Sequence, residues 1–188
     1  MIKKIPTVLL LVMVACWMPP TAHADQNDPR LDVLFSRLQT SHDFRRIQHY
    51  TQEIWRIWSI HDNSDAREEL EEGVAELYDE DYTASLWHLN SAIDHVPQFA
   101  EAWNSRAVFY FRQGNYVASL ADIEQTLKLE PRHFGALVGR GQCYFRLHKY
   151  KQALDSFERA LAINPWLYQA QRNVDVLKAL VAWQKASI

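Results

Sequence analysis

Histidines and acidic residues are the first side chains to consider for catalysis or metal binding. The chain has eight His but no HExxH motif. His88 and His95 lie on one expected helix, and they offer two ligands where zinc sites need three or four. The acidic run at residues 68–72 is typical of a solvated helix start that the helix dipole favours. With no Ser-His-Asp signature and no glycine-rich phosphate loop, we expect no catalytic residue, no metal site and no cofactor.

Two arginines and one aspartate form the second candidate group. Arg106 and Arg140 each precede a small residue, Ala107 and Gly141 respectively. Asp122, on the next expected helix after Arg106, is within reach of that position. Two interpretations are open: an internal Arg–Asp pair between stacked helices, or an arginine free to anchor a ligand. We favour the structural pair of Asp122 with Arg106 or Arg140, because buried charges are usually paired.

The cysteine count indicates no internal disulfide. If Cys16 is removed with an N-terminal leader, Cys143 is the single remaining thiol. We expect it to be a small buried hydrophobe, as free Cys commonly is.

An internal repeat organises the elements that must position these side chains. Tyr82, Tyr116 and Tyr150 follow one another at a constant spacing. Pro97, Pro131 and Pro165 repeat at the same spacing. The period of about 34 residues is the signature of a helical array. Because a residue before proline is pushed out of the helical region, each second helix should end near Val96, Glu130 or Asn164.

The repeats resemble the tetratricopeptide family, whose pattern is Trp, Leu-Gly, Tyr, Ala, Phe and Pro at fixed offsets. The matching positions of the middle repeat are Trp103, Arg106-Ala107, Tyr110, Ser119, Ile123 and Pro131. Those of the third repeat are Leu137, Arg140-Gly141, Tyr144, Ala153, Phe157 and Pro165, and those of the weaker first repeat are Glu69, Glu72-Gly73, Glu76, Ser85, Leu89 and Pro97. The resemblance implies an all-α, right-handed solenoid of three helical hairpins at residues 66–99, 100–133 and 134–167.

Helical segments are expected on both sides of the repeats. Asp28 followed by Pro29 is a good helix start, and two amphipathic stretches follow within residues 25–65. We interpret them as an N-terminal helix pair that covers the exposed end of the stack. Residues 168–188 carry apolar residues along one side and suit a C-terminal capping helix, because a repeat stack needs terminal units with one polar face.

Residues 1–24 have the pattern of a secretory leader. Lys3 and Lys4 precede an apolar run from Ile5 to Trp17, and Ala22-His23-Ala24 is a small-residue cleavage site. The apolar run is shorter than the roughly 20 residues of a membrane-spanning helix, so we expect an exported, periplasmic protein without a membrane span. The alternative is a lipid anchor on Cys16, because Val14-Ala15-Cys16 partly resembles a lipoprotein processing site. A net charge of -3, a pI near 6.2 and the lack of a basic stripe argue against nucleic acid as a partner.

The resemblance also implies a working surface. In this family the first helices of successive repeats line a concave groove. Carried onto this sequence, the groove residues are Leu70, Val74, Leu77, Tyr78, Asn104, Val108, Phe111, Arg112, Val138, Gln142, Phe145 and Arg146. The same offsets also include Arg67, Glu101 and Gly135. The family's clamp for a C-terminal carboxylate uses Lys, Asn and Arg at set groove positions. Here several of those positions are occupied by Leu70, Val74, Gly135 and Gly139, which argues against that clamp.

A groove of this composition suits an amphipathic helix or an extended apolar peptide. The main hypothesis is therefore an exported scaffold or adaptor that binds another protein or peptide. A different class, an accessory subunit or enzyme acting on a cell-wall or small-molecule ligand, would show a pocket with converging polar groups. A third interpretation is that the N-terminal helices of the chain itself fill part of the groove, because large exposed apolar patches are uncommon.

Overall fold

A computed structural model describes residues 25–186, so the predicted leader, Cys16 included, lies outside the described residues. This range contains nine α-helices and no strand. They are α1 (Arg30–Thr40), α2 (Phe44–Trp58), α3 (Ser64–Tyr78), α4 (Tyr82–His95), α5 (Ala100–Arg112), α6 (Tyr116–Leu129), α7 (Phe134–Arg146), α8 (Tyr150–Ile163) and α9 (Tyr168–Ala186). None of these helices is long and apolar enough to cross a membrane.

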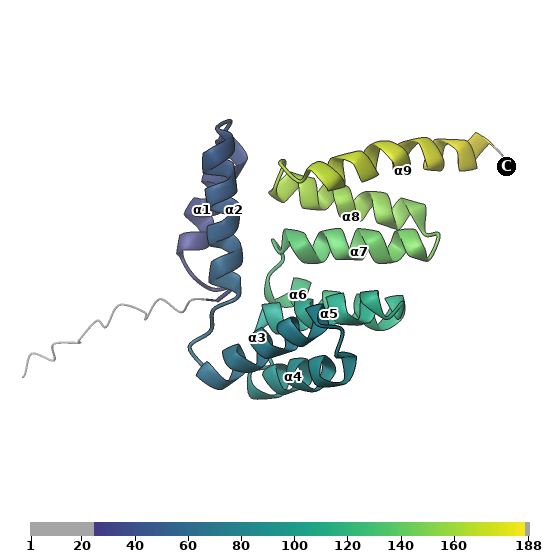
Figure 1. Cartoon of the computed structure of the whole chain (residues 1–188). Coiled ribbons are helices and arrows are strands. Elements are labelled where there is room, and N and C mark those ends of the chain that lie inside the picture. Colours follow the sequence, from purple (N-terminus) through teal and green to yellow (C-terminus); the bar gives the residue numbers. More distant parts are fainter. Residues whose placement is uncertain (1–24, 187–188) are drawn as a thin grey trace, which may run out of the picture.

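The middle of the chain is a stack of helical hairpins. Helices α3 and α4, α5 and α6, and α7 and α8 pack pairwise, and α9 packs on α8 (Figure 1). Helices α5, α7 and α9 begin at Ala100, Phe134 and Tyr168, which are separated by the same spacing as the repeated prolines. The predicted all-α hairpin stack is confirmed, and α9 stands where the first helix of a fourth repeat would begin.

The prolines end the second helices as expected. Helices α4, α6 and α8 end immediately before Val96, Glu130 and Asn164, whose backbones leave the helical region ahead of Pro97, Pro131 and Pro165. This follows from the clash between a proline ring and a helical residue before it.

The turn inside each hairpin has one left-handed residue at a fixed position. Gly114 has φ 73°, and Glu80 and His148, at the equivalent places, have φ 64° and 57°. Glycine adopts this conformation without steric cost. The first and third hairpins use the same turn with side chains that favour it less.

The N-terminal helix pair lies along one side of the stack (Figure 1). Its core contains residues of α1 and α2 together with Phe134 of α7, and Ile163 and Leu167 pack against it. Gln39 donates to the carbonyl oxygens of Ala162 and Ile163 at 3.2 and 3.3 Å. The expectation that this pair covers the exposed end of the stack is therefore wrong: it joins the third repeat from the side.

Surface composition explains this placement. Helix α3, at the predicted end, exposes the carboxylates of Glu68 and Glu72, and charged side chains are unfavourable to bury against an apolar helix pair. The third repeat presents Phe134 and, next to it, Gly135. A β-carbon at Gly135 would lie 2.9 Å from Cζ2 of Trp55, so the absence of a side chain there lets the indole ring approach α7.

Candidate functional site

The first helices α3, α5 and α7 form the concave face that the sequence predicted, and α9 continues it. Two cavities open on this face. The first, which we call the proximal cavity, has a volume of about 560 Å³. It is lined by Trp55, Ser59, Leu70, Glu71, Val74, Leu77, Tyr78, Glu101, Asn104, Ser105, Val108 and Arg112.

The second, which we call the distal cavity, has a volume of about 410 Å³ and lies between α5, α7 and α9. It is lined by Phe111, Gln142, Phe145, Arg146, Phe157, Gln169, Asn173, Val176 and Leu177. The two cavities meet along the C-terminal turns of α5, where Val108 and Arg112 line the proximal cavity and Phe111 lines the distal one. Together they form a groove with an apolar base.

The structure brings twelve of the fifteen residues at the predicted groove offsets into these two cavities, and Arg67, Gly135 and Val138 line neither. Leu70, Val74, Leu77, Tyr78, Glu101, Asn104, Val108 and Arg112 line the proximal cavity, and Phe111, Gln142, Phe145 and Arg146 line the distal one. Val138 is different, because it packs with Tyr144 and Leu154 against the core between α7, α8 and α9. Its position in the repeat predicts a side chain that faces the groove, but α9 packs against it and includes it in the core.

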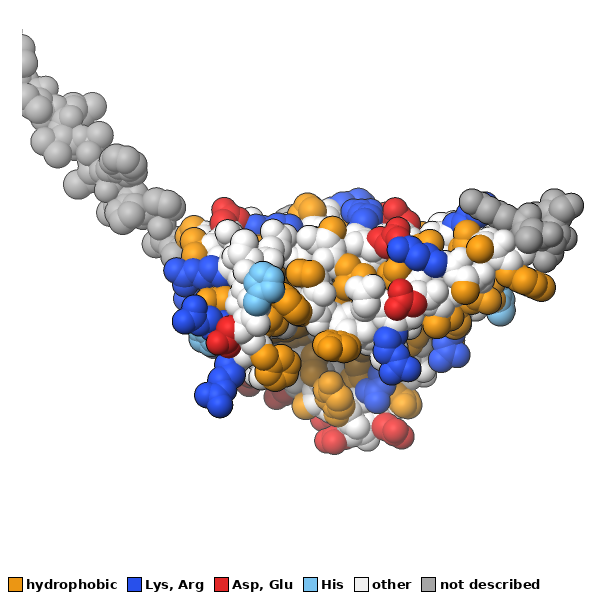
Figure 2. All heavy atoms as spheres, turned by 90° about the horizontal axis from the view of Figure 1, so that it is seen from above, with side chains coloured by type: hydrophobic (Ala, Val, Ile, Leu, Met, Phe, Trp, Pro, Cys, Tyr) orange, Lys and Arg blue, Asp and Glu red, His pale blue; other side chains and the backbone are white. Residues whose placement is uncertain are grey.

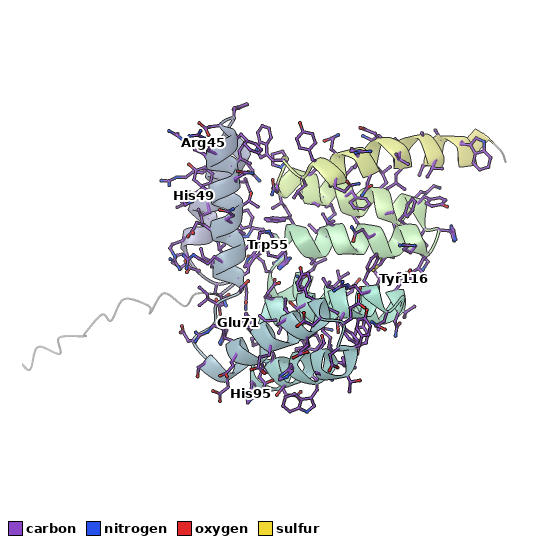
Figure 3. The ribbon with its side chains drawn as sticks, viewed as in Figure 1. Arg45, His49, Trp55, Glu71, His95 and Tyr116 are labelled. Atoms are coloured by element: carbon purple, nitrogen blue, oxygen red, sulfur yellow. The ribbon has the colours of Figure 1, made fainter. Side chains whose placement is uncertain are left out.

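The N-terminal helix pair closes one end of the groove and leaves the rest open. Trp55, Ser59 and Glu71 line the proximal cavity, and Figure 3 shows Trp55 on the side of α2 that faces the stack, with Glu71 below it near α3. The sequence interpretation in which these helices fill the groove applies only to this end. No repeat offset could predict Trp55, because it comes from outside the repeats.

A buried network fixes the wall behind Trp55. The ring of His133 is fully buried and stacks on Trp58, with ring centroids 4.1 Å apart and planes 13° apart. His133 Nδ1 accepts the backbone N–H of Ala136 at 3.0 Å, so the proton is on Nε2, which donates to Glu101 at 2.8 Å. Glu101 therefore connects α5 to α7, and Trp58 connects both to α2.

Two arginines stand at the groove, in different situations. Arg112 donates from Nη1 to the carbonyl oxygen of Leu77 at 2.8 Å, and its guanidinium lies 5.6 Å from the ring centroid of Tyr78. It therefore joins α5 to the end of α3. Arg146 is exposed at the mouth of the distal cavity, where a charged or polar group of a ligand can reach it.

Within the stack, Arg106 forms the expected pair with Asp122. Its Nε and Nη2 donate to the two carboxylate oxygens at 2.8 and 2.9 Å, and its Nη1 donates to Asn90 at 2.7 Å. The hydrogen bonds from Arg106 to Asp122 raise the pKa of the arginine above its ordinary value. This arginine is fully engaged and is not free for a ligand.

Arg140 does not share this arrangement. The residue that takes the place of Asp122 in the third repeat is Ser156, whose hydroxyl accepts from Arg140 Nε at 3.0 Å. The exposed carboxylate of Asp155 is 3.6 Å away. Burial and the charge of Arg159 lower the pKa of Arg140. Including Arg140 in the Asp122 pair was wrong, because the repeat changes the acid to a hydroxyl.

The other candidate residues have structural surroundings. His88 Nδ1 lies 2.8 Å from Glu69 and 3.3 Å from Glu72, so part of the acidic run contacts α4. Within residues 25–186, no group of three or more His, Cys, Asp or Glu side chains could hold a metal ion. Cys143 is buried and donates to the hydroxyl of Ser119 at 3.2 Å, and burial raises the pKa of its thiol.

Comparison with known proteins matches this geometry to a family. Two tetratricopeptide repeat family models match the sequence, one at residues 135–167 and the other at residues 70–123. The chain belongs to the tetratricopeptide repeat (TPR) family. The matched residues include both helices of the third hairpin and the groove positions of the first two.

Solved TPR domains have the same fold. The first TPR of Spaghetti (RPAP3), bound to the HSP90 peptide SRMEEVD, has a TM-score of 0.62 and 22% identity, and the match covers 64% of this chain and 96% of that one. The first TPR domain of human RPAP3 gives 0.61 and 22%, with 66% and 98% covered. The Sgt2 TPR domain from Aspergillus fumigatus gives 0.62 and 17%, with 66% and 83% covered. The comparison with curated proteins found no match.

Helix α9 supplies groove residues that the sequence analysis left out. Gln169 and Val176 line the distal cavity. They occupy, one repeat later, the offsets of Gly135 and Gln142, so extending the same TPR offsets into a fourth unit would have found both. Asn173 and Leu177 complete that wall, and Phe157 reaches it from α8.

Proposed function

We propose that this TPR protein is a scaffold or adaptor that binds another protein, or a peptide segment of it, through the groove formed by the proximal and distal cavities. The observation that carries the proposal is the exposure of apolar side chains along one face. Tyr78, Val108 and Phe145 are 74%, 46% and 42% exposed. Apolar surface gathered on one open face is typical of an interaction site. Two structurally similar TPR domains hold chaperone peptides: the first TPR of Spaghetti (RPAP3) holds an HSP90 peptide, and the second TPR domain of human RPAP3 holds an HSP70 peptide.

The groove composition favours an apolar occupant over a C-terminal carboxylate. Leu70 and Val74 line the proximal cavity. One guanidinium N–H of Arg112 already donates to the carbonyl oxygen of Leu77 in α3, so it is not available to a ligand carboxylate. The distal cavity is lined by the aromatic rings of Phe111, Phe145 and Phe157 and by the amide groups of Gln142, Gln169 and Asn173. An amphipathic helix, or an extended segment with apolar side chains, fits this pattern.

Photo-crosslinking from the groove tests this proposal. A photoreactive phenylalanine at Val108 or Phe145 should crosslink one discrete partner in cells, because both side chains are exposed within the groove. Val117 on α6 is 71% exposed and lines neither groove cavity, so it provides the matched control. A partner captured equally well from Val117, or captured only from there, would contradict binding in the groove.

We also propose that the protein is exported and that its mature form begins at Asp25. The support is the order of Lys3 and Lys4, the apolar run and the Ala22-His23-Ala24 site. N-terminal sequencing of the protein from its native host should read Asp25-Gln26-Asn27. A lipid-modified Cys16 at the N-terminus, or an intact residue 1, is the result that contradicts soluble export.

A further inference from the structure

A third cavity lies away from the groove, where the N-terminal helix pair meets the turn before α9. Its volume is about 400 Å³, and it shares no lining residue with the proximal or distal cavity. Its lining residues are His42, Phe44, Ile47, Gln48, Thr51, Gln52, Asn164, Trp166, Leu167 and Tyr168. We call it the junction cavity.

Three aromatic rings of the junction cavity are open to solvent. Tyr168 is 82% exposed, Phe44 68% and Trp166 36%. The exposed parts of these three rings do not pack in the core. Exposed apolar surface that gathers in one place marks a binding site. Figure 2, which looks onto the end of the molecule that holds α9, shows hydrophobic side chains gathered in the middle of this face with Lys and Arg on either side.

The Trp166 ring is held in position before any ligand arrives. Its Nε1 donates to the carbonyl oxygen of Leu38 at 3.0 Å, and its backbone N–H donates to Asn164 Oδ1 at 3.1 Å. The ring of His42 meets it edge-on at 6.0 Å. Because the indole is already anchored to both walls of the cavity, little side-chain conformational entropy is lost when a ligand stacks on it.

Apart from the ring of His42, the polar side chains of the cavity are uncharged amide and hydroxyl groups. Gln48, Thr51 and Gln52 occupy positions i, i+3 and i+4 of α2, so they share one helical face. None of these three side chains has a hydrogen-bond partner among the residues that the structure describes. The cavity lining contains no Asp, Glu, Lys or Arg. Amide and hydroxyl groups can both donate and accept, which suits a ligand rich in hydroxyl groups.

We propose that the junction cavity binds a neutral oligosaccharide. The apolar C–H face of a sugar ring stacks on Trp166, with Tyr168 and Phe44 beside it, while Gln48, Thr51 and Gln52 exchange hydrogen bonds with its hydroxyl groups. Flat apolar faces combined with a few placed uncharged polar groups are the recognition pattern that such a ligand requires. An anionic glycan finds no Lys or Arg in this lining, whose one basic side chain, His42, packs edge-on against Trp166, and a basic peptide finds no carboxylate.

Calorimetric titration of the full-length protein with three uncharged hexasaccharides tests the proposal: cellohexaose, maltohexaose and chitohexaose. At least one should bind and change the tryptophan fluorescence. Tyr168→Ala and Phe44→Ala should each weaken that binding at least about 10-fold while the melting temperature stays close to that of the parent, since both side chains are mostly exposed. Trp87→Ala, which removes a 61% exposed ring from α4, should leave the affinity unchanged.

The remaining outcomes overturn the proposal. If none of the three sugars binds at millimolar concentration, or if binding survives both Tyr168→Ala and Phe44→Ala, the junction cavity is not an oligosaccharide site. A Leu/Phe-rich nonapeptide included as a fourth probe separates the competing explanation. Binding of that peptide alone, lost in Tyr168→Ala, would identify the cavity as a protein-docking surface.

Discussion

At the residue scale, Arg106 and Asp122 form a bidentate charge pair inside the stack. Asp122 is 5% exposed and receives two hydrogen bonds from one guanidinium. Removing one partner of a buried pair leaves the other unsatisfied. Asp122→Ala should therefore lower the free energy of unfolding by about 1–3 kcal/mol, the range for an unpaired buried polar group.

The measurement is urea denaturation monitored by helical circular dichroism. Glu158→Ala is the control, because Glu158 and its partner Lys178 lie 3.2 Å apart with side chains that are 48% and 60% exposed. It should change stability by less than about 0.5 kcal/mol, as exposed pairs do. Equal midpoints for Asp122→Ala and the parent protein would show that the internal pair does not form in solution.

Asp28 gives a pH dependence at the same scale. Its pKa lies below the ordinary value because Arg30 donates hydrogen bonds to the carboxylate, with Nε at 2.9 Å from Oδ1. A carboxyl whose folded pKa is depressed contributes stability above its unfolded pKa, about 4, and that contribution is lost as the pH falls through the folded pKa. Denaturation at a series of pH values should show a shallower acid loss for Asp28→Asn than for the parent. Parallel curves below pH 4 would contradict this linkage.

The comparison of Arg106 with Arg140 also shows what a repeat pattern predicts at this scale. The pair of Arg106 with Asp122 could be predicted because both residues lie at helical positions that the hairpin brings together. The same register places Ser156 opposite Arg140, so the loss of the second pair was already readable in the sequence. The network of Glu101, His133 and Trp58 was not, because it needs the position of α2 relative to the stack.

At the scale of elements, the contact between α2 and α7 depends on one missing side chain. A β-carbon at Gly135 would meet the indole of Trp55 at 2.9 Å from Cζ2. Gly135→Ala should therefore destabilise the protein by about 1–3 kcal/mol, as overpacking does. Thermal or urea denaturation together with tryptophan fluorescence measures both the stability and the displaced ring.

Gly139, one turn further along α7, is the matched control for Gly135. A β-carbon there would meet only Ile123 Cδ1, at the ordinary contact distance of 3.4 Å. Alanine also favours a helix interior over glycine by up to about 1 kcal/mol. Gly139→Ala should be neutral or stabilising. The docking argument fails if Gly135→Ala is as stable as Gly139→Ala.

Helix boundaries could be predicted well within the repeats and poorly outside them. Pro97, Pro131 and Pro165 end their helices by local sterics, so the sequence was sufficient there. The docking of α1 and α2 depends on contacts with Phe134 and Leu167, which lie far along the chain, at the two ends of the third repeat. Each of these two amphipathic helices has an apolar face that the sequence predicts. The sequence does not indicate which surface of the stack that face packs against.

At the scale of the whole molecule, the groove prediction rests on two phenylalanines. Phe111 and Phe145 occupy the same offset in adjacent repeats and both line the distal cavity. Aromatic anchors often dominate an interface, and truncating one commonly costs about 2 kcal/mol or more of binding. The Phe111→Ala and Phe145→Ala double variant should lose the partner crosslinked from Val108 while keeping its helical signal and a cooperative melt.

The single variants separate the two roles of these rings. Phe145 is 42% exposed, whereas Phe111 packs partly against the core around Ile123. Phe145→Ala should thus leave the melting temperature nearly unchanged and still weaken partner binding. A folded double variant that retains the same partner at full yield would falsify the groove hypothesis. Arg146→Ala should weaken capture only modestly and reduce its salt dependence, because charges at the edge of an interface mostly steer association.

The lateral position of the N-terminal pair changes how the chain is connected to itself. Contacts in a simple repeat stack join neighbours only, so such a stack can unravel from either end. Here Arg132 bonds to Asp32, 100 residues earlier in the chain, and Trp166 bonds to Leu38 across 128 residues. Loop closure over such separations slows folding. The chain ties its beginning to its last repeat, so the stack should unfold as one cooperative unit that forms more slowly than its helical content alone implies.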